Sequence, residues 1–252
     1  MRNKFKPILF STEMVQAILE GKKTMTRRIL DTGIETMPEN TVVHITDNGA
    51  MAHFQSKSFN PSNICGVKGK FEIGDILYVR ETLRIGAWNK GYAACAFDYK
   101  ASPKLIKTPF IEFPVIKHFD MLSKALSQLD SLGVRPHTWA PGKSPLPWIP
   151  AIHMPKEAAR IFLEVTDVRV ERLRDISEED AIAEGFGKIV NEKYIHPGWF
   201  LNHLNNHHMF NAIDSFASMW VKLNGKGAWK QNPWVWVYEF KVIEKPADFG
   251  SN

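Results

Sequence analysis

Cysteines are few in this sequence of 252 residues, and long apolar runs are absent. Its two cysteines, Cys65 and Cys95, lie far apart and give no disulfide framework, which predicts a cytoplasmic protein. No run approaches the roughly 20 apolar residues that a bilayer-crossing helix needs, so we expect no membrane partner. Residues 1–6 are basic, but no apolar segment follows them, and we therefore predict no signal peptide.

Several common chemical motifs are also missing. The chain has no glycine-rich phosphate loop, no CxxC pair and no GxSxG nucleophile motif. His203, His207 and His208 include an i, i+4 pair, a spacing that metals use on helices. No carboxylate or cysteine stands nearby at ligand spacing. We therefore expect a polar surface helix there, and we predict neither a metal site nor a cofactor.

Positive charge is present in modest excess. The formal net charge is +5, a bias that favours anionic partners. The cations cluster at Lys22, Lys23, Arg27 and Arg28, and the chain has eight tryptophans. Aromatic faces beside basic residues suit stacked nucleic-acid bases, whereas the same tryptophans are equally suited to filling the core of a small barrel.

Residues 11–30 combine a short helix, a sharp turn and a strand. Apolar residues recur at helical spacing between residues 14 and 19. Gly21 is placed to end this helix, because glycine accepts the left-handed conformation that a C-cap needs. Residues 24–30 are rich enough in β-branched side chains to favour a strand. Thr26 and Arg28 then point the same way, since residues i and i+2 of a strand share a face.

A second strand is predicted at residues 76–81. Its alternation sends Tyr78 and Arg80 to one face and Glu81 to the other, among apolar side chains. A carboxylate on an apolar face is costly unless it meets a cation. We expect either Lys23 or Arg28 to be that cation.

The remaining chain alternates short elements with long insertions. Eight prolines between residues 101 and 150 predict mostly loop, and Asn48-Gly49 predicts a hairpin turn. Further strands are expected at 6–10, 41–46, 50–54, 83–85, 92–99, 160–173 and 235–243, and helices at 120–132, 155–159, 177–184 and 210–223. Periodicity alone therefore predicts a mixed α and β fold with much strand.

The turn pattern Gly21-x-Lys23-x-x-Thr26-x-Arg28 resembles the signature of the ASCH domains, a branch of the PUA-like β-barrel proteins. Four further blocks resemble that family in the same order, at residues 74–82, 152–160, 176–181 and 232–237. Together they are similar to the larger, phage- and prophage-associated ASCH proteins, some of which are labelled morphogenetic proteins.

The resemblance implies an α+β fold, a small PUA-like β-barrel with flanking short helices and long insertions. We expect a single domain over residues 1–245, with insertions at about 31–70, 101–150 and 187–210, and a tail at 246–252. The insertion at 101–150 would cover the barrel mouth.

Small bacterial ASCH proteins are amidohydrolases that remove the acyl group from N4-acetylcytidine, and their catalytic trio would correspond to Lys23, Thr26 and Glu81. The residue types themselves support this chemistry. A lysine crowded by cations has a lowered pKa and can act as a base, which a threonine hydroxyl needs before it becomes a nucleophile. Thr26 and a water molecule both remain open as the nucleophile.

The predicted binding residues for substrate or nucleic acid are Arg28, Arg27, Lys22, Arg80, Tyr78, His153 and Trp236. Arg160 is assigned a structural role, and Asp180 and Glu184 are interpreted as ordinary solvated acids. The expected partners are a nucleoside, a nucleotide or a single-stranded nucleic acid. The alternatives are a non-catalytic RNA- or DNA-binding module, a metal-independent ribonuclease, or a plain solvated surface turn.

Overall fold

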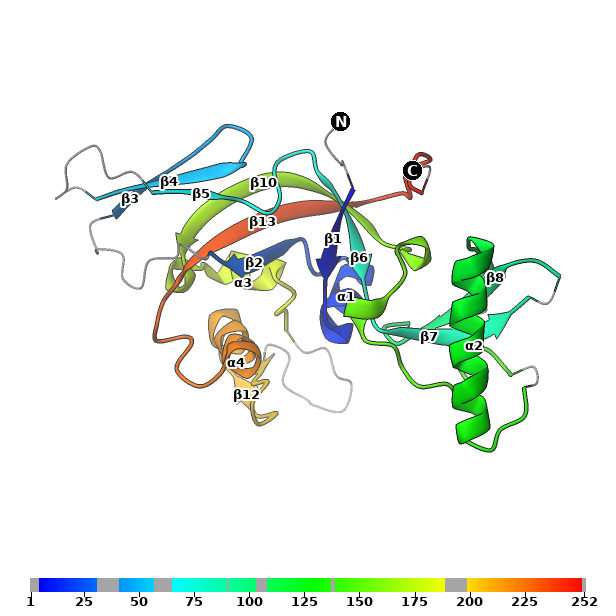
Figure 1. The fold of residues 1–252 in the computed structure, drawn as a ribbon. Helices are drawn as coiled ribbons and strands as arrows, with labels where there is room; N and C mark the ends of the chain where they lie inside the picture. Colours follow the sequence, from blue (N-terminus) through cyan, green and yellow to red (C-terminus); the bar gives the residue numbers. More distant parts are fainter. Residues whose placement is uncertain are drawn as a thin grey trace. The chain divides into compact units, whose positions relative to one another are not determined.

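The computed structural model describes residues 5–30, 41–56, 65–89, 91–102, 108–136, 139–188 and 199–250. It has a mixed α+β fold with several sheets and few helices (Figure 1). Its contacts group into two compact units. The first unit comprises Met1–Gln16, Leu77–Phe162 and Ile243–Asn252, and the second comprises Ala17–Ile76 and Leu163–Val242.

The second unit is built on three neighbouring strands, in the order β10-β13-β2. The two long strands are β10 (Phe162–Arg172) and β13 (Trp234–Ile243), and β2 (Met25–Ile29) ends the order (Figure 1). β2 pairs with β13 in antiparallel register, so that Thr26 lies opposite Tyr238 and Arg28 lies opposite Trp236. Directly opposite residues share a face, and these four side chains therefore lie on one side of the sheet.

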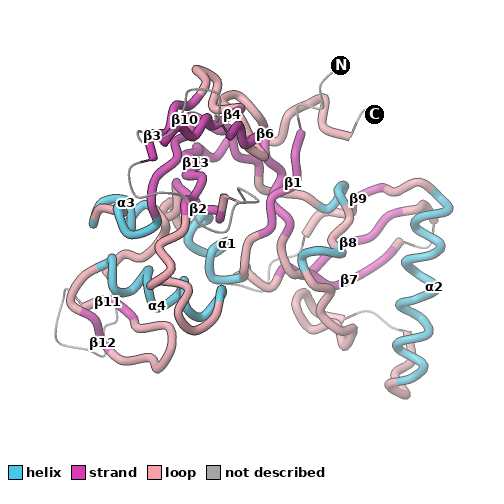
Figure 2. The backbone as a smooth tube through the Cα atoms, turned by 60° about the vertical axis from the view of Figure 1, so that its left-hand side comes forward, coloured by secondary structure: helices cyan, strands magenta, loops and turns pink. Residues whose placement is uncertain are grey.

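Two smaller sheets and two helices complete the second unit. The antiparallel sheet β3-β4-β5 comprises Thr41–Ile45, Met51–Ser56 and Cys65–Lys68, and the hairpin β11-β12 comprises Phe200–Leu201 and His208–Met209. The helices are α3 (Glu178–Ala183) and α4 (Ala212–Asn224), with the 3₁₀ turn η3 (Leu173–Asp175) before α3 (Figure 2).

One apolar cluster of this unit lies on the face of β2 opposite Thr26. Met25, Val235 and Val237 of the sheet pack there against Ala181 of α3 and Phe216 of α4. Side chains on a strand alternate between faces, so β2 presents apolar and charged residues to this cluster in turn. Met25 is packed among the apolar side chains, and Arg27, which lies on the same face, has to be neutralised there.

The first unit holds its own sheet of three strands, β7-β8-β9 (Leu83–Trp88, Ala94–Tyr99 and Ile111–Glu112), with a register shift between Ile85 and Ala87. Its other strands are the neighbours β1 (Phe5–Leu9) and β6 (Ile76–Arg80). Its helical elements are α2 (Val115–Ser131), η1 (Ala151–His153) and η2 (Lys156–Ala158). Helix α1 (Thr12–Leu19) follows β1.

Most predicted elements are confirmed within one to three residues. The Asn48-Gly49 turn joins β3 to β4, with Gly49 at φ +72°. Helix α2 is longer than predicted, because it begins directly after Pro114. The predicted helix around His203 and His207 is wrong: that segment connects the strands of the β11-β12 hairpin.

The predicted closed barrel is not found, because no sheet in the described ranges closes on itself. Within the tail predicted at 246–252, Phe249 is buried, and its ring lies 4.6 Å from that of Phe162 and 5.2 Å from that of Phe5.

The expectation of a single domain stays a prediction. Residues 31–40, 57–64 and 189–198, which belong to the predicted insertions, lie outside the described part. In that part, no helix is long and apolar enough to cross a membrane.

Candidate functional site

The turn between α1 and β2 places Lys23 inside the second unit. Gly21 adopts a left-handed conformation, with φ +69°, as its C-cap position predicts. The backbone N–H groups of Lys22 and Lys23 both donate to the carbonyl of Ala17, at 2.8 and 3.1 Å. This tight turn brings Lys23 into an isolated β-bridge with Glu184, the residue that ends α3.

The Lys23 amine is surrounded by three oxygen acceptors. It donates to the Glu184 carboxylate Oε2 at 2.6 Å, to the Glu184 carbonyl at 2.9 Å and to the Met25 carbonyl at 2.7 Å. Three acceptors match the three N–H bonds of an ammonium group. The residue is only 1% exposed and Glu184 4%, so the pair is a buried ion pair at the edge of the sheet.

Burial and neighbouring charges act on the Lys23 amine in opposite directions. Burial lowers the pKa of Lys23 from its ordinary value, and Glu184 opposes this by favouring the charged form. Arg28 and Arg27 add to the lowering, because like charges disfavour the ammonium. The net direction is downward, which agrees with the sequence-based expectation of a lysine crowded by cations.

One face of the sheet carries Thr26, Arg28, Trp236 and Tyr238, by the register of β2 and β13. Thr26 is 2% exposed, and we find no hydrogen bond of its hydroxyl in the described ranges. The rings of Trp236 and Tyr238 are parallel within 14°, with centroids 6.1 Å apart. A nearly buried hydroxyl therefore shares one face of the sheet with two stacked aromatic rings, and Tyr238 lies directly opposite it.

Arg28 lies half-buried on this face. Burial lowers its pKa, and Glu184 and Tyr238 act in the other direction. The Tyr238 hydroxyl is buried without a hydrogen-bond partner in the part of the chain that the structure describes. Burial raises the pKa of Tyr238 to about 12, although nearby backbone groups of Phe71 and Lys70 work against that rise.

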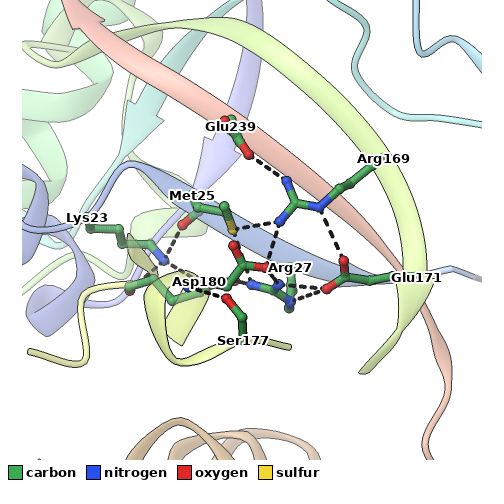
Figure 3. A network of polar contacts seen from close by, with 9 residues as sticks. Lys23, Met25, Arg27, Arg169, Glu171, Ser177, Asp180 and Glu239 are labelled. Carbon is green, nitrogen blue, oxygen red and sulfur yellow. Dashed lines mark hydrogen bonds and ion pairs between the residues drawn. The ribbon is translucent and has the colours of Figure 1, made fainter. Parts of the chain in front are cut away.

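Arg27 points to the opposite face and into a network of carboxylates (Figure 3). Its guanidinium donates to Glu171 Oε1 at 2.6 and 3.1 Å, to Asp180 Oδ2 at 2.5 Å and to Glu184 Oε1 at 3.4 Å. Arg169 binds the far side of the network, through Asp180 at 2.7 Å, Glu171 at 3.2 Å and Glu239 at 2.5 Å. The Arg27 side chain is 0% exposed, so its charge depends wholly on these partners.

Helix α3 supplies two of these carboxylates, and their interpretation as ordinary solvated acids is wrong. Asp180 binds Arg27 and Arg169, and Glu184 binds Lys23 and Arg27. Their i, i+4 spacing puts both on one helix face. A signal was present in the sequence, because four cations at residues 22–28 need carboxylates and the most acid-rich segment is 178–184.

Gly185 shows how closely Lys23 packs against the end of α3. Gly185 has φ +101°, and a Cβ atom there would lie 3.1 Å from the Ala17 Cβ and 3.4 Å from the Lys23 Cβ. A larger residue would be strained in its backbone and would also press on the lysine stem. Glycine at this position therefore allows the carboxylate of the preceding residue to reach the amine.

Glu81, the predicted third member of the trio, lies in the first unit and is bound by Arg160. The guanidinium donates to its two carboxylate oxygens at 2.7 and 2.9 Å and stacks 4.1 Å above the Tyr99 ring. Glu81 is 1% exposed, as its apolar face predicts. Arg160 fills the role for which we expected Lys23 or Arg28, and this is the structural role that the sequence suggested for Arg160. A part for Glu81 in chemistry stays a prediction.

The remaining predicted binding residues have varied surroundings. Lys22 is exposed and pairs with Glu20 at 2.6 Å. Arg80 donates to the carbonyls of Ile152 and Met154, which places it against η1, and His153 in that turn is exposed. Tyr78 packs against Phe249, with centroids 5.4 Å apart. Their part in binding stays a prediction.

Among the residues that the structure describes, no group of three or more His, Cys, Asp and Glu is arranged to hold a metal ion. No protein-family model matches this chain, and neither the curated proteins nor the solved structures contain a match. The class that the coordinates define is thus a mixed α+β protein with a buried lysine–carboxylate pair at a sheet edge.

Proposed function

We propose that this chain is an ASCH-type, PUA-like protein that hydrolyses the amide of an N4-acylated cytidine-type nucleoside or nucleotide without a metal ion. The observation that carries the proposal is the buried Lys23–Glu184 pair, with 2.6 Å between amine and carboxylate, directly before the strand that carries Thr26 and Arg28. Perturbed, buried titratable pairs are typical of acid–base sites. The ordered sequence blocks that resemble ASCH proteins support the substrate class.

In the proposed reaction, Glu184 replaces Glu81 as the carboxylate partner. The Lys23 ammonium passes a proton to Glu184 Oε2 along their 2.6 Å hydrogen bond, because burial lowers the pKa of Lys23. The neutral amine then takes the proton of Thr26, whose oxygen bonds to the amide carbon. The protonated Glu184 donates to the departing N4 amine as the C–N bond breaks, and water hydrolyses the resulting ester of Thr26.

Arg28 is proposed to stabilise the oxyanion that develops on the carbonyl. It lies on the face of Thr26, and its guanidinium is near enough to Glu184 and Tyr238 to respond to their charges. A water molecule activated by Lys23 would serve the same scheme in place of the Thr26 hydroxyl. The Thr26→Val variant separates the two, since only direct attack by threonine needs its oxygen.

The test is hydrolysis of N4-acetylcytidine by the wild type, Lys23→Ala, Thr26→Val and Glu184→Gln. Each variant that keeps a folded circular-dichroism spectrum should lose at least about 100-fold in kcat/KM, the usual contribution of a general acid or base. Lys241→Ala is the matched control, because Lys241 is an exposed lysine paired with Glu164 at 3.1 Å in the same unit. A folded wild type that leaves acylated cytidines intact overturns the proposal.

Glu81→Gln decides between the two carboxylates. If Glu81→Gln abolishes hydrolysis while Glu184→Gln retains it, Glu81 is the catalytic carboxylate and the trio inferred from the sequence holds. A non-catalytic nucleic-acid binder would instead show affinity that falls steeply with salt and no hydrolysis. The burial of Lys23 and Arg27 favours the enzyme over the binder, because a cation already paired with carboxylates offers little to phosphates.

A further inference from the structure

Arg27 shares the Glu184 carboxylate with Lys23. Lys23 holds Oε2 at 2.6 Å, and Arg27 holds Oε1 at 3.4 Å. Arg28, on the Thr26 face, acts on the same carboxylate electrostatically. The carboxylate therefore lies between the two cations that bind it, Lys23 and Arg27, and near enough to Arg28 to act on its charge.

We infer that Arg27 is a positioning residue, which holds one oxygen of Glu184 so that the other stays on the Lys23 amine. As a statement about catalysis this inference rests on the proposed function, because Arg27 would touch neither substrate nor reacting atoms. As a statement about geometry it is independent of any activity. Arg27 is assigned to the face opposite Thr26 by strand alternation and by the position of its guanidinium 5.9 Å from the centroid of the Phe216 ring in α4.

An arginine suits this task because its planar fork presents donors in several directions at once. Arg27 uses Nε and one terminal nitrogen for Glu171, that same nitrogen for Asp180, and the other terminal nitrogen for Glu184. A lysine of similar length offers one nitrogen and cannot span three carboxylates from two elements. Arg27→Lys thus keeps the charge and removes the geometry.

Helix α3 is tied to the sheet through the same guanidinium. Asp180 and Glu184 both receive hydrogen bonds from Arg27, which fixes the rotation of the helix as well as the carboxylate. Arg169 holds Asp180 and Glu171 independently of Arg27. A variant at Arg27 therefore keeps half of the network, and we expect it to fold.

The charged groups that face the Lys23–Glu184 pair influence the pKa of Lys23, so the effect of Arg27 can be measured as a change in that pKa. Lys23 is faced by Glu184 from α3 and by Arg27 and Arg28 from β2, and beyond Arg27 lie Glu171, Asp180, Arg169 and Glu239. Arg27 lowers the pKa of Lys23, so its removal raises that pKa. A Glu184 carboxylate released from Arg27 can also turn both oxygens toward the amine, which raises the pKa further.

The experiment is a pH titration of Lys23 by NMR on protein labelled with ¹³Cε-lysine, with the resonance assigned from the spectrum of Lys23→Met. Arg27→Gln and Arg27→Lys should both raise the midpoint of the Lys23 titration, by about half a pH unit or more. The control is Glu178→Gln. Glu178 lies on the same helix, but its carboxylate accepts from the backbone N–H groups of Ala212 and Ile213 at the start of α4.

Each outcome decides the question. An upward shift in Arg27→Lys with none in Glu178→Gln supports positioning, because Glu178→Gln loosens the helix without touching the pair. If Lys23 titrates with the wild-type midpoint in Arg27→Lys, the inference is overturned, since a positive charge at position 27 would then be enough without the geometry of arginine. An equal shift in Glu178→Gln also overturns it, because general loosening of α3 would explain both.

A kinetic experiment tests the catalytic part of the inference separately. With N4-acetylcytidine as substrate, Arg27→Lys should lower kcat about 10-fold or more and leave KM unchanged, because Arg27 does not touch the substrate. Failure of the wild type to hydrolyse this compound removes the proposed function and leaves the NMR result to decide on positioning. A rise in KM alone would mean that Arg27 binds substrate, and the inference would be wrong.

Discussion

The two units each bury a glutamate, and the contrast between Glu184 and Glu81 is instructive. Glu81 is held by one arginine through two hydrogen bonds of 2.7 and 2.9 Å, with the guanidinium stacked on Tyr99. Glu184 divides its oxygens between a lysine and an arginine. A fork-to-fork pair has matched donors and acceptors on both sides. A carboxylate bound to a desolvated lysine has a partner that can lose its proton.

The largest difference should appear when each carboxylate is made neutral. Glu184→Gln leaves the Lys23 ammonium buried without a counter-charge, and we expect a loss of about 3–5 kcal/mol in the free energy of unfolding. Urea denaturation at neutral pH measures this. Lys23→Met combined with Glu184→Gln should recover part of the loss, because a buried ion pair can be replaced by uncharged groups at little cost. A double variant less stable than either single variant would contradict this account.

Glu81→Gln should cost less, about 1–3 kcal/mol, because the partially exposed Arg160 can turn toward water when its carboxylate is lost. Its hydrolytic activity should stay within a few-fold of the wild type. The same urea titration gives the comparison directly. A loss larger than that of Glu184→Gln would reverse the ranking of the two sites.

Tyr238→Phe tests the face that carries Thr26. The phenol is buried without a hydrogen-bond partner in the described ranges, so removing its oxygen should stabilise the fold by about 1 kcal/mol at neutral pH. Because the folded pKa is raised to about 12, the wild-type fold keeps its stability below pH 10 and loses stability as the pH rises from 10 toward 12, where the unfolded tyrosine ionises more readily than the buried one. The free energy of unfolding of Tyr238→Phe should therefore fall less steeply between pH 10 and 12 than that of the wild type, as measured by urea denaturation at each pH. The same slope in both proteins would contradict a buried phenol at this position.

Lys241→Ala should have the smallest effect, within about 0.5 kcal/mol, because exposed ion pairs contribute little to stability. The comparison with Lys23→Ala is made by thermal unfolding at matched ionic strength. Equal losses for the two lysines would mean that burial does not distinguish them.

The sequence predicted the local elements of the chain better than it predicted the partners of its charged side chains. Gly21, the strand after it and the faces of Thr26 and Arg28 follow from local rules and are present in the structure. The helix predicted at 177–184 is also present, and Ser177 caps it with its hydroxyl, which accepts from the Asp180 N–H. These features depend on residues within one turn of each other.

The partners of the buried charges could not be read locally. Lys23 and Glu184 are 161 positions apart, and Glu81 and Arg160 are 79 apart. Alternation along a strand showed that Glu81 needs a cation, but it could not say which one, since pairing across a sheet depends on the register of distant strands. A solvated acid and a buried one look alike on a short helix, and Glu184 was misinterpreted for this reason.

Three carboxylates of helix α3 and its C-cap residue bind different sets of partners: Glu178 binds the start of α4, Asp180 binds Arg27 and Arg169, and Glu184 binds Lys23 and Arg27. An insertion of one residue would turn everything beyond it by about 100° and separate the acids on either side. The segment should thus accept many substitutions on its outer surface but almost no change of length, which makes it a poor place for natural or engineered insertions.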